Sequence, residues 1–146
     1  MRTRVGYKRE AERVCRSDNA MKPTMTVLDI ADGLTSGAAT LIDLQYGAPE
    51  DWWLRAHFAH GEENVLVAFD RPTAFRVTDE GNLLEYWSAR DRGSGFVYRL
   101  EGSSWLAEYE ASAAHPEPGM KHYLFAGSDE CLEVLSSSEP VVRRRN

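Results

Sequence analysis

Two histidines three residues apart, His57 and His60, are the closest approach in this sequence to a metal-binding motif. Zinc is held in proteins by three or four side chains, so a pair alone is an incomplete ligand set. Both histidines lie in a stretch where apolar and polar residues alternate, which predicts a β-strand. Residues three apart on a strand point to opposite faces of the sheet. The sequence therefore predicts no metal site here.

The candidate nucleophiles lack the neighbours that would activate them. No serine stands in the Gly-x-Ser-x-Gly turn of a hydrolase. Cys131 is surrounded by acidic residues, which disfavour the reactive thiolate and indicate a structural cysteine. Residues 92–95 are rich in glycine, but they join two predicted strands, whereas a phosphate-binding loop leads into a helix. We interpret them as a hairpin turn.

Three pairs of carboxylates could in principle serve glycoside hydrolysis, which needs two such groups held across a cleft. They are Asp79 with Glu80, Glu108 with Glu110, and Asp129 with Glu130. Each pair is equally expected of a solvated turn. We therefore assign no catalytic, cofactor-binding or metal-binding residue from the sequence, and we expect no cofactor.

The alternation of apolar and polar residues also predicts the elements that would position these groups. Four short strands joined by polar turns are expected at residues 51–60, 65–78, 83–91 and 96–101. A bend or bulge is expected at Arg71-Pro72, because proline cannot donate a hydrogen bond to a sheet. A hairpin turn is expected at 79–82, where Gly81 can adopt a positive φ. Strands joined by short turns are usually antiparallel neighbours.

The rest of the chain adds predicted strands at 26–30, 39–46, 122–125 and 131–135. Residues 103–111 are ambiguous, because Ser103 or Ser104 could cap a short helix, while the following residues alternate as in a strand. We favour the helix. These elements predict an α+β, mostly β fold: a single domain with an antiparallel meander sheet of about six to eight strands and one or two short helices.

Charge divides the chain into three parts. Residues 1–22 carry a net +4 and are expected to form a basic extension or a short helix, and residues 143–146 are expected to be a frayed basic tail that adds +3. Because the whole chain carries −6, the predicted β-rich domain between them, residues 23–142, carries −13. A body this acidic repels nucleic acid and suits a basic protein partner. Acidity for solubility alone is the other interpretation.

The composition favours a cytoplasmic protein. No apolar run approaches the ~18 residues of a membrane span. The basic N-terminal segment is not followed by the apolar stretch of a secretory signal. The two cysteines, Cys15 and Cys131, are far apart in sequence and are expected to be reduced rather than bridged.

Alternation separates some tryptophans from the predicted core. Trp53 falls on the face opposite Leu54, and Trp87 on the face opposite Tyr86. Such residues are either covered by another segment or exposed as anchors for a partner. With nearby carboxylates they make up the candidate partner-binding residues, which are Trp53, Trp87, Asp79, Glu80, Glu108 and Glu110.

Several stretches of the C-terminal half carry a resemblance rather than a chemical signature. They are Ser104-Trp105-Leu106, His122-Tyr123-Leu124-Phe125, residues 129–136 with Pro140, and the earlier residues 75–81. Through them the chain resembles small uncharacterised bacterial β-rich proteins of the toxin-immunity type. The resemblance implies a protein that neutralises a toxin. It transfers no functional residue, because these stretches are apolar strands and a turn.

We consider three hypotheses for the function. The first is a non-enzymatic, acidic interaction protein that binds and neutralises a basic protein partner, such as a toxin domain. The second is a small-molecule-binding β domain, whose divided aromatic residues would line a pocket. The third is a hydrolase of unrecognised type that uses His57 or His122 with a nearby carboxylate. We favour the first hypothesis and expect neither nucleic acid nor membrane as a partner.

Overall fold

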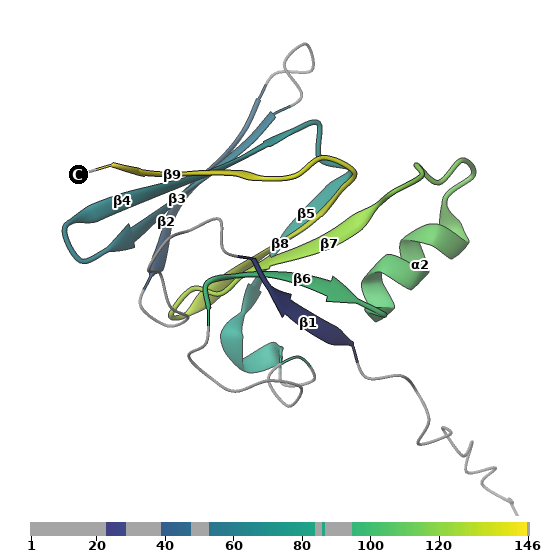
Figure 1. Ribbon diagram of the computed structural model, residues 1–146, viewed down its shortest axis with the longest axis horizontal. Helices are drawn as coiled ribbons and strands as arrows, with labels where there is room; N and C mark the ends of the chain where they lie inside the picture. The colour runs from purple at the N-terminus through teal and green to yellow at the C-terminus, as the bar shows by residue number, and fades with distance from the viewer. Residues whose placement is uncertain (1–22, 29–38, 48–52, 84–85, 87–94, 146) are drawn as a thin grey trace, which may run out of the picture.

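The computed structural model describes residues 23–28, 39–47, 53–83, 86 and 95–145 (Figure 1). Their paired strands are all antiparallel, and they are accompanied by the helix α2 (Ser104–Ser112) and the 3-10 turn η1 (Glu80–Asn82). The strands are β1 (Thr24–Val27), β2 (Thr40–Tyr46), β3 (Trp53–His60), β4 (Glu63–Asp70), β5 (Ala74–Asp79), β6 (Val97–Glu101), β7 (Lys121–Phe125), β8 (Glu130–Ser136) and β9 (Val141–Arg145). The predicted α+β, mostly β class is confirmed.

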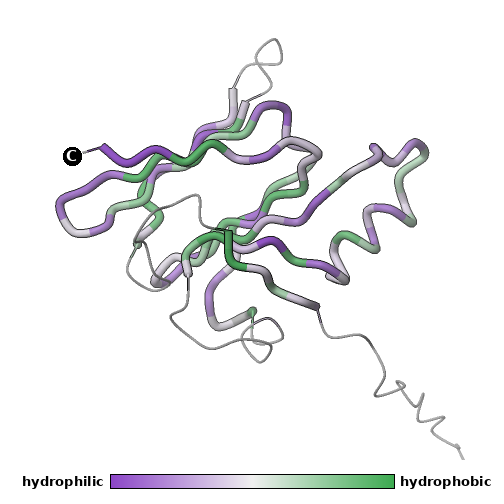
Figure 2. The backbone as a smooth tube through the Cα atoms, in the orientation of Figure 1, coloured by the Kyte–Doolittle hydropathy of each residue, from purple (hydrophilic) through white to green (hydrophobic). Residues whose placement is uncertain are grey.

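The strands form two stacked sheets. One has five strands in the order β1-β6-β7-β8-β5, and the other has four in the order β2-β3-β4-β9. The hydrophobic core lies between them, where Phe58 of β3 meets Phe96 edge to face at 5.0 Å between ring centroids. The central strands are correspondingly the most hydrophobic part of the chain, whereas the end of β9 is hydrophilic (Figure 2).

The alternation predicted for β3 is confirmed in the structure. Leu54, Ala56 and Phe58 are fully buried, whereas Arg55 is exposed and His57 is half-buried on the opposite face. A side-chain period of two places every second residue on the core face of a sheet. The predicted strands over β2, β7 and β8 are also confirmed, although β7 and β8 are buried on both faces.

A second apolar cluster covers the far side of the five-stranded sheet. It is formed by buried residues of β6, β7, β8 and the segment after η1, including Tyr86, Tyr98 and Leu124. The helix α2 begins beside this face, and Ser103 caps it by accepting a hydrogen bond from the Leu106 N–H at 3.2 Å. The helical prediction for residues 103–111 is thus confirmed. None of the described helices is long and apolar enough to cross a bilayer.

The predicted strand at 65–78 divides at the expected bend. Arg71 adopts φ 52°, and the chain passes from β4 in one sheet to β5 in the other. Consecutive strands are therefore not always neighbours. The predicted meander holds for β2-β3-β4 and for β6-β7-β8, whereas β5 pairs with β8 and β6 also pairs with β1.

The hairpin predicted at residues 79–82 is wrong. Asp79 caps the 3-10 turn η1 instead, and its carboxylate accepts from the Gly81 N–H at 2.8 Å. Leu83 lies outside any strand and Tyr86 is helical, so the strand predicted at 83–91 is wrong at its described positions. Both residues are buried in the second cluster, because residues three apart share one side of a helical turn.

The C-terminal segment, predicted as a frayed basic tail, forms strand β9. It pairs with β4 over five residues, from Val141 opposite Ala68 to Arg145 opposite Asn64. Val142 packs against the core, and Arg144 donates a hydrogen bond to Glu63 at 2.8 Å. Alternation was masked here by three consecutive arginines. Residues 1–22, predicted as a basic extension, lie outside the described residues.

The docking of β9 can be tested with two neighbouring valines. Val142→Asp places a carboxylate against the core and should lower the free energy of unfolding by about 2 kcal/mol. Val141 is 50% exposed, so Val141→Asp should change it by no more than about 0.5 kcal/mol. Urea unfolding measures both, and equal effects of the two substitutions would contradict the pairing of β9.

Candidate functional site

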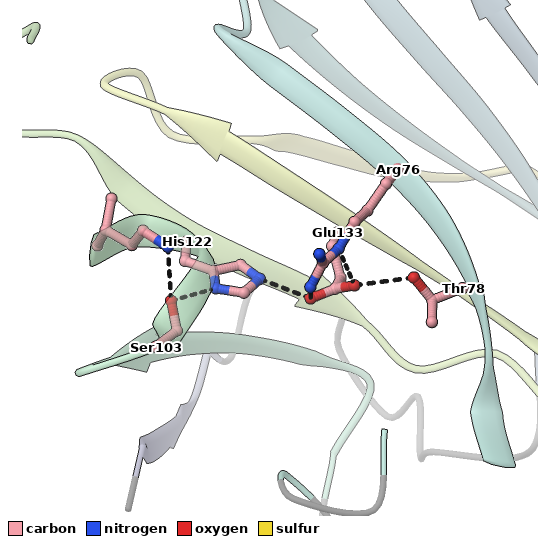
Figure 3. Close-up of polar contacts among 6 residues, drawn as sticks. Arg76, Thr78, Ser103, His122 and Glu133 are labelled. Atoms are coloured by element: carbon pink, nitrogen blue, oxygen red, sulfur yellow. Dashed lines mark hydrogen bonds and ion pairs between the residues drawn. The ribbon is translucent and has the colours of Figure 1, made fainter. Parts of the chain in front are cut away.

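A row of polar side chains crosses the helix-side face of the five-stranded sheet (Figure 3). Glu133 lies in the middle of β8, directly opposite Arg76 in the β5–β8 ladder. His122 extends from β7 on the other side, and Ser103 stands where β6 gives way to α2. Three adjacent strands and the start of the helix thus bring these groups together. We call Arg76, Thr78, Ser103, His122 and Glu133 the buried polar row.

The carboxylate of Glu133 accepts four hydrogen bonds in this row. Arg76 donates from Nε at 2.6 Å and from Nη2 at 3.0 Å, a bidentate pair. The Thr78 hydroxyl donates at 3.0 Å, and Nε2 of His122 lies 2.9 Å from Oε1. The side chains of Glu133 and His122 are completely buried. A buried carboxylate is stable only with such partners.

The hydrogen bonds determine how His122 carries its proton. An ionised carboxylate can only accept, so Nε2 of His122 bears the hydrogen that faces Glu133. Nδ1 then lies 2.7 Å from the Ser103 hydroxyl, which can donate to it. The Ser103 oxygen at the same time accepts from the Leu106 N–H. Every polar atom along this line therefore has a partner.

The charges in the row reinforce one another. Burial alone raises the pKa of Glu133, but hydrogen bonds from His122 and Arg76, together with the charge of Arg76, outweigh it and lower the pKa from 4.5 to about 2. Burial has the opposite effect on Arg76 and by itself lowers its pKa. The contacts of Arg76 with Glu133 more than reverse this effect, so its pKa is raised. The row therefore holds an ionised Glu133 and a charged Arg76 at neutral pH.

Aromatic rings enclose the row. The guanidinium of Arg76 lies 4.2 Å from the centroid of the Trp105 ring, a cation–π contact. The edge of His122 meets Trp105 at 5.2 Å and Tyr86 at 6.0 Å between ring centroids. Trp105 thus connects α2 to β5 and β7. The row reaches the surface at its β5 end, where 40% of the Arg76 side chain is exposed and Thr78 is half-buried.

The residue types in the row are those of a hydrolytic triad, with Ser103, His122 and Glu133 in hydrogen-bonded sequence. This is the combination of nucleophile, histidine and carboxylate that a hydrolase would need. A nucleophile must also reach its substrate, yet Ser103 is 1% exposed and its oxygen caps α2. The geometry therefore supports a structural role, in which the row fixes the helix and three strands.

The residues predicted to bind a partner do not form one surface. Trp53 lies on the outer face of the four-stranded sheet, beneath Arg55 at 4.5 Å. Asp79 and Glu80 stand at the end of β5, whereas Glu108 and Glu110 are exposed on α2, at the other end of the five-stranded sheet (Figure 1). Trp87 lies outside the described residues.

Two further acidic residues, Asp129 and Glu130, lie beside Asp79 and Glu80 in the structure. Asp79 is directly opposite Glu130 in the β5–β8 ladder, and the Glu80 N–H donates to the Asp129 carbonyl at 2.9 Å. We call Asp79, Glu80, Asp129 and Glu130 the acidic corner. Like charges placed directly opposite each other in a sheet destabilise it. Two of the three carboxylate pairs of the sequence, Asp79–Glu80 and Asp129–Glu130, thus lie next to each other where β5 ends and β8 begins.

The histidines His57 and His60 point to different faces, as predicted. Nδ1 of His57 lies 3.5 Å from Asp43, and Nδ1 of His60 lies 4.0 Å from Glu63. Among the described residues, no group of three or more potential ligands could hold a metal ion. Cys131 is buried in the second cluster, and Cys15 lies outside the described residues.

A hollow of about 370 Å³ opens where β6 ends and β7 begins. Apolar side chains of Leu100, Leu106 and Met120 line it, together with the charged Arg99, Lys121 and Glu101. Arg99 lies 3.5 Å from the Glu101 carboxylate, and its buried Nε has no hydrogen-bond partner among the described residues. This volume falls within the range of small-molecule sites, about 300–1,000 Å³.

Sequence reasoning missed the buried polar row as a unit. One signal was present, because Glu133 interrupts an otherwise apolar strand between Leu132 and Val134. A charge at such a position requires a buried partner. Its partner Arg76 is 57 residues away and could not be identified from spacing.

Comparisons with protein-family models, with curated proteins and with solved structures found no match to this chain. The resemblance to proteins of the toxin-immunity type therefore stays a prediction.

The lowered pKa of Glu133 predicts acid sensitivity. A carboxylate whose pKa is about 2 when folded and 4.5 when unfolded contributes stability above pH 4.5, which is lost as the pH falls towards 2. This group should account for about 3 kcal/mol of that loss. Urea unfolding between pH 5 and 2 should show a shallower loss for Glu133→Gln than for the unmodified protein.

Glu110→Gln is the matched control, because Glu110 is exposed on α2, outside the buried polar row and the acidic corner, and should leave the acid slope nearly unchanged. Titration of the Glu133 carboxyl carbon by NMR gives its pKa directly in the unmodified protein. An ordinary pKa near 4.5 would contradict the charge assignment of the row.

Proposed function

We propose that this protein is a non-enzymatic interaction protein that binds a basic protein partner through the acidic corner. The observation that carries the proposal is the cross-strand pair Asp79–Glu130, two like charges placed directly opposite each other. Such a pair lowers the stability of the sheet by itself. A cationic partner would relieve that repulsion on binding.

The surroundings of the acidic corner support a protein as the partner. Asp79, Asp129 and Glu130 are exposed. The corner lies at the end of β5, an edge strand of its sheet, where Val77 is 41% exposed. Carboxylates beside an exposed apolar side chain match the mixed character of a protein interface. Complementary charge would also speed association and select among partners.

The resemblance of the C-terminal half to toxin-immunity proteins suggests a basic toxin domain as one partner of this class. Neutralisation would then consist of occupying the basic surface that the toxin uses. We place this function in the cytoplasm, where the thiol of the buried Cys131 would stay reduced. The proposed mode of action involves neither a cofactor nor a membrane.

The acidic corner can be tested by neutralisation without loss of shape. In Asp79→Asn/Glu130→Gln, both residues remain nearly isosteric, and we expect the affinity for an oligolysine peptide to fall by about tenfold. The same change should raise the free energy of unfolding by up to about 1 kcal/mol, because it removes a like-charge pair. Fluorescence anisotropy at low and high salt, together with urea unfolding, measures both effects.

Glu108→Gln/Glu110→Gln is the matched control, since it removes the same charge from α2. If both double variants weakened peptide binding equally, net charge alone would explain the effect. That result would refute specific binding at the acidic corner. Binding that is indifferent to salt would also contradict the electrostatic basis of the proposal. Capture of the host partner with each variant then tests the partner class.

Small-molecule binding is the second candidate, favoured by the hollow beside Leu106. Its apolar lining holds two cations, Arg99 and Lys121, against the single carboxylate of Glu101, which suits an apolar molecule with one anionic group. Apolar carboxylic acids should then raise the melting temperature of the protein. Leu106→Trp, which fills the hollow, should abolish this increase.

A further inference from the structure

The outer face of the four-stranded sheet carries a charge opposite to that of the chain as a whole. Side chains that alternate away from the core line a hollow of about 270 Å³ on this face. We call this set the arginine face: Arg55, Leu66, Ala68, Val141, Arg143 and Arg145. It has three cations around an apolar floor and no carboxylate in its lining.

Strand register explains why these residues gather. Arg143 of β9 is directly opposite Leu66 of β4, and Val141 is opposite Ala68. Ala68 is in turn opposite Arg55 of β3. Three neighbouring strands thus present Arg55 and Arg143 on either side of small apolar residues. Arg55, Arg143 and Arg145 are all exposed.

The arginines of this face are not neutralised by the described carboxylates. Arg144, which alternates to the other face, pairs with Glu63, whereas Arg143 and Arg145 form no ion pair with any described residue. Arg55 lies over the Trp53 ring. The face also holds Asp43, which His57 and Gln45 engage, and Asp70, which is opposite Trp53 at the far end of β4.

The arginine face ends at an open edge. β9 is the last strand of its sheet and pairs on one side with β4. Within the described part of the chain, no strand pairs with its other side. An extended peptide can add to such an edge through main-chain hydrogen bonds, with specificity from alternate side chains. A second copy of β9 would bring arginine against arginine, so the edge disfavours self-association.

We propose that the arginine face binds an extended acidic segment of a protein partner, which adds to the free edge of β9. Carboxylates of the segment would pair with Arg143 and Arg145, and an apolar side chain would enter the hollow over Leu66 and Ala68. Guanidinium groups bind carboxylates in a bidentate manner, which favours this pairing. The apolar floor, which an apolar side chain can fill, favours a protein segment over a nucleic acid as the occupant.

The test uses the full chain and a fluorescent peptide of alternating glutamate and valine. We expect binding that weakens with salt, and Arg143→Gln/Arg145→Gln should lower the affinity by about tenfold. Arg144→Gln is the matched control on the same strand and should lower it by less than about twofold, because its side chain alternates to the opposite face. Circular dichroism of each variant verifies that the sheet is intact.

Main-chain addition has a separate readout. Hydrogen exchange should show protection of β9 amides when the glutamate–valine peptide is bound. An alternating lysine–valine peptide should not bind this face, and single-stranded oligothymidine should bind at least about tenfold more weakly than the acidic peptide. Absence of acidic-peptide binding, equal loss with Arg144→Gln, or tighter binding of oligothymidine would each overturn the proposal. None of these outcomes involves the acidic corner.

Discussion

A fully buried carboxylate in the middle of β8 is the constraint on which the rest of the structure depends. Glu133 is ionised and completely buried, so the elements around it must supply hydrogen-bond donors. β5 supplies Arg76 and Thr78, and β7 supplies His122. A slip of β5 by one residue would turn Arg76 to the other face of the sheet and leave the charge uncompensated. The buried polar row thus specifies the pairing of three strands.

The same row ties the helix to the sheet and explains why triad chemistry does not imply catalysis. Ser103 both caps α2 and faces His122, and Trp105 of the helix stacks on Arg76. His122 and Ser103 are buried, so they stabilise the fold and do not contact ligands. Any partner or ligand must bind to the surface instead. There the charges are segregated: carboxylates gather at the end of β5 and β8, and arginines gather on the outer face of the other sheet.

This segregation changes the meaning of the net charge. The value of −13 for residues 23–142 describes an acidic body, but it excludes the arginines of β9, which belong to the folded sheet. Treating them as a tail concealed a basic surface next to Arg55. A partner would meet local fields of opposite sign on the two sheets, so its own charge pattern would decide where it binds.

The sequence by itself determined which side of β3 faces the core. There, the alternation over Leu54–Phe58 follows from the pleat, which is a local property of the backbone. The alternation pattern gave wrong predictions in two places. Leu83 lies outside any strand and Tyr86 is helical rather than extended, and in β9 three consecutive arginines hid the alternation. Only the tertiary structure decided which strands pair and which charges meet. Arg76 and Glu133 are 57 residues apart, and long-range pairing depends on packing of the whole chain rather than on any local pattern.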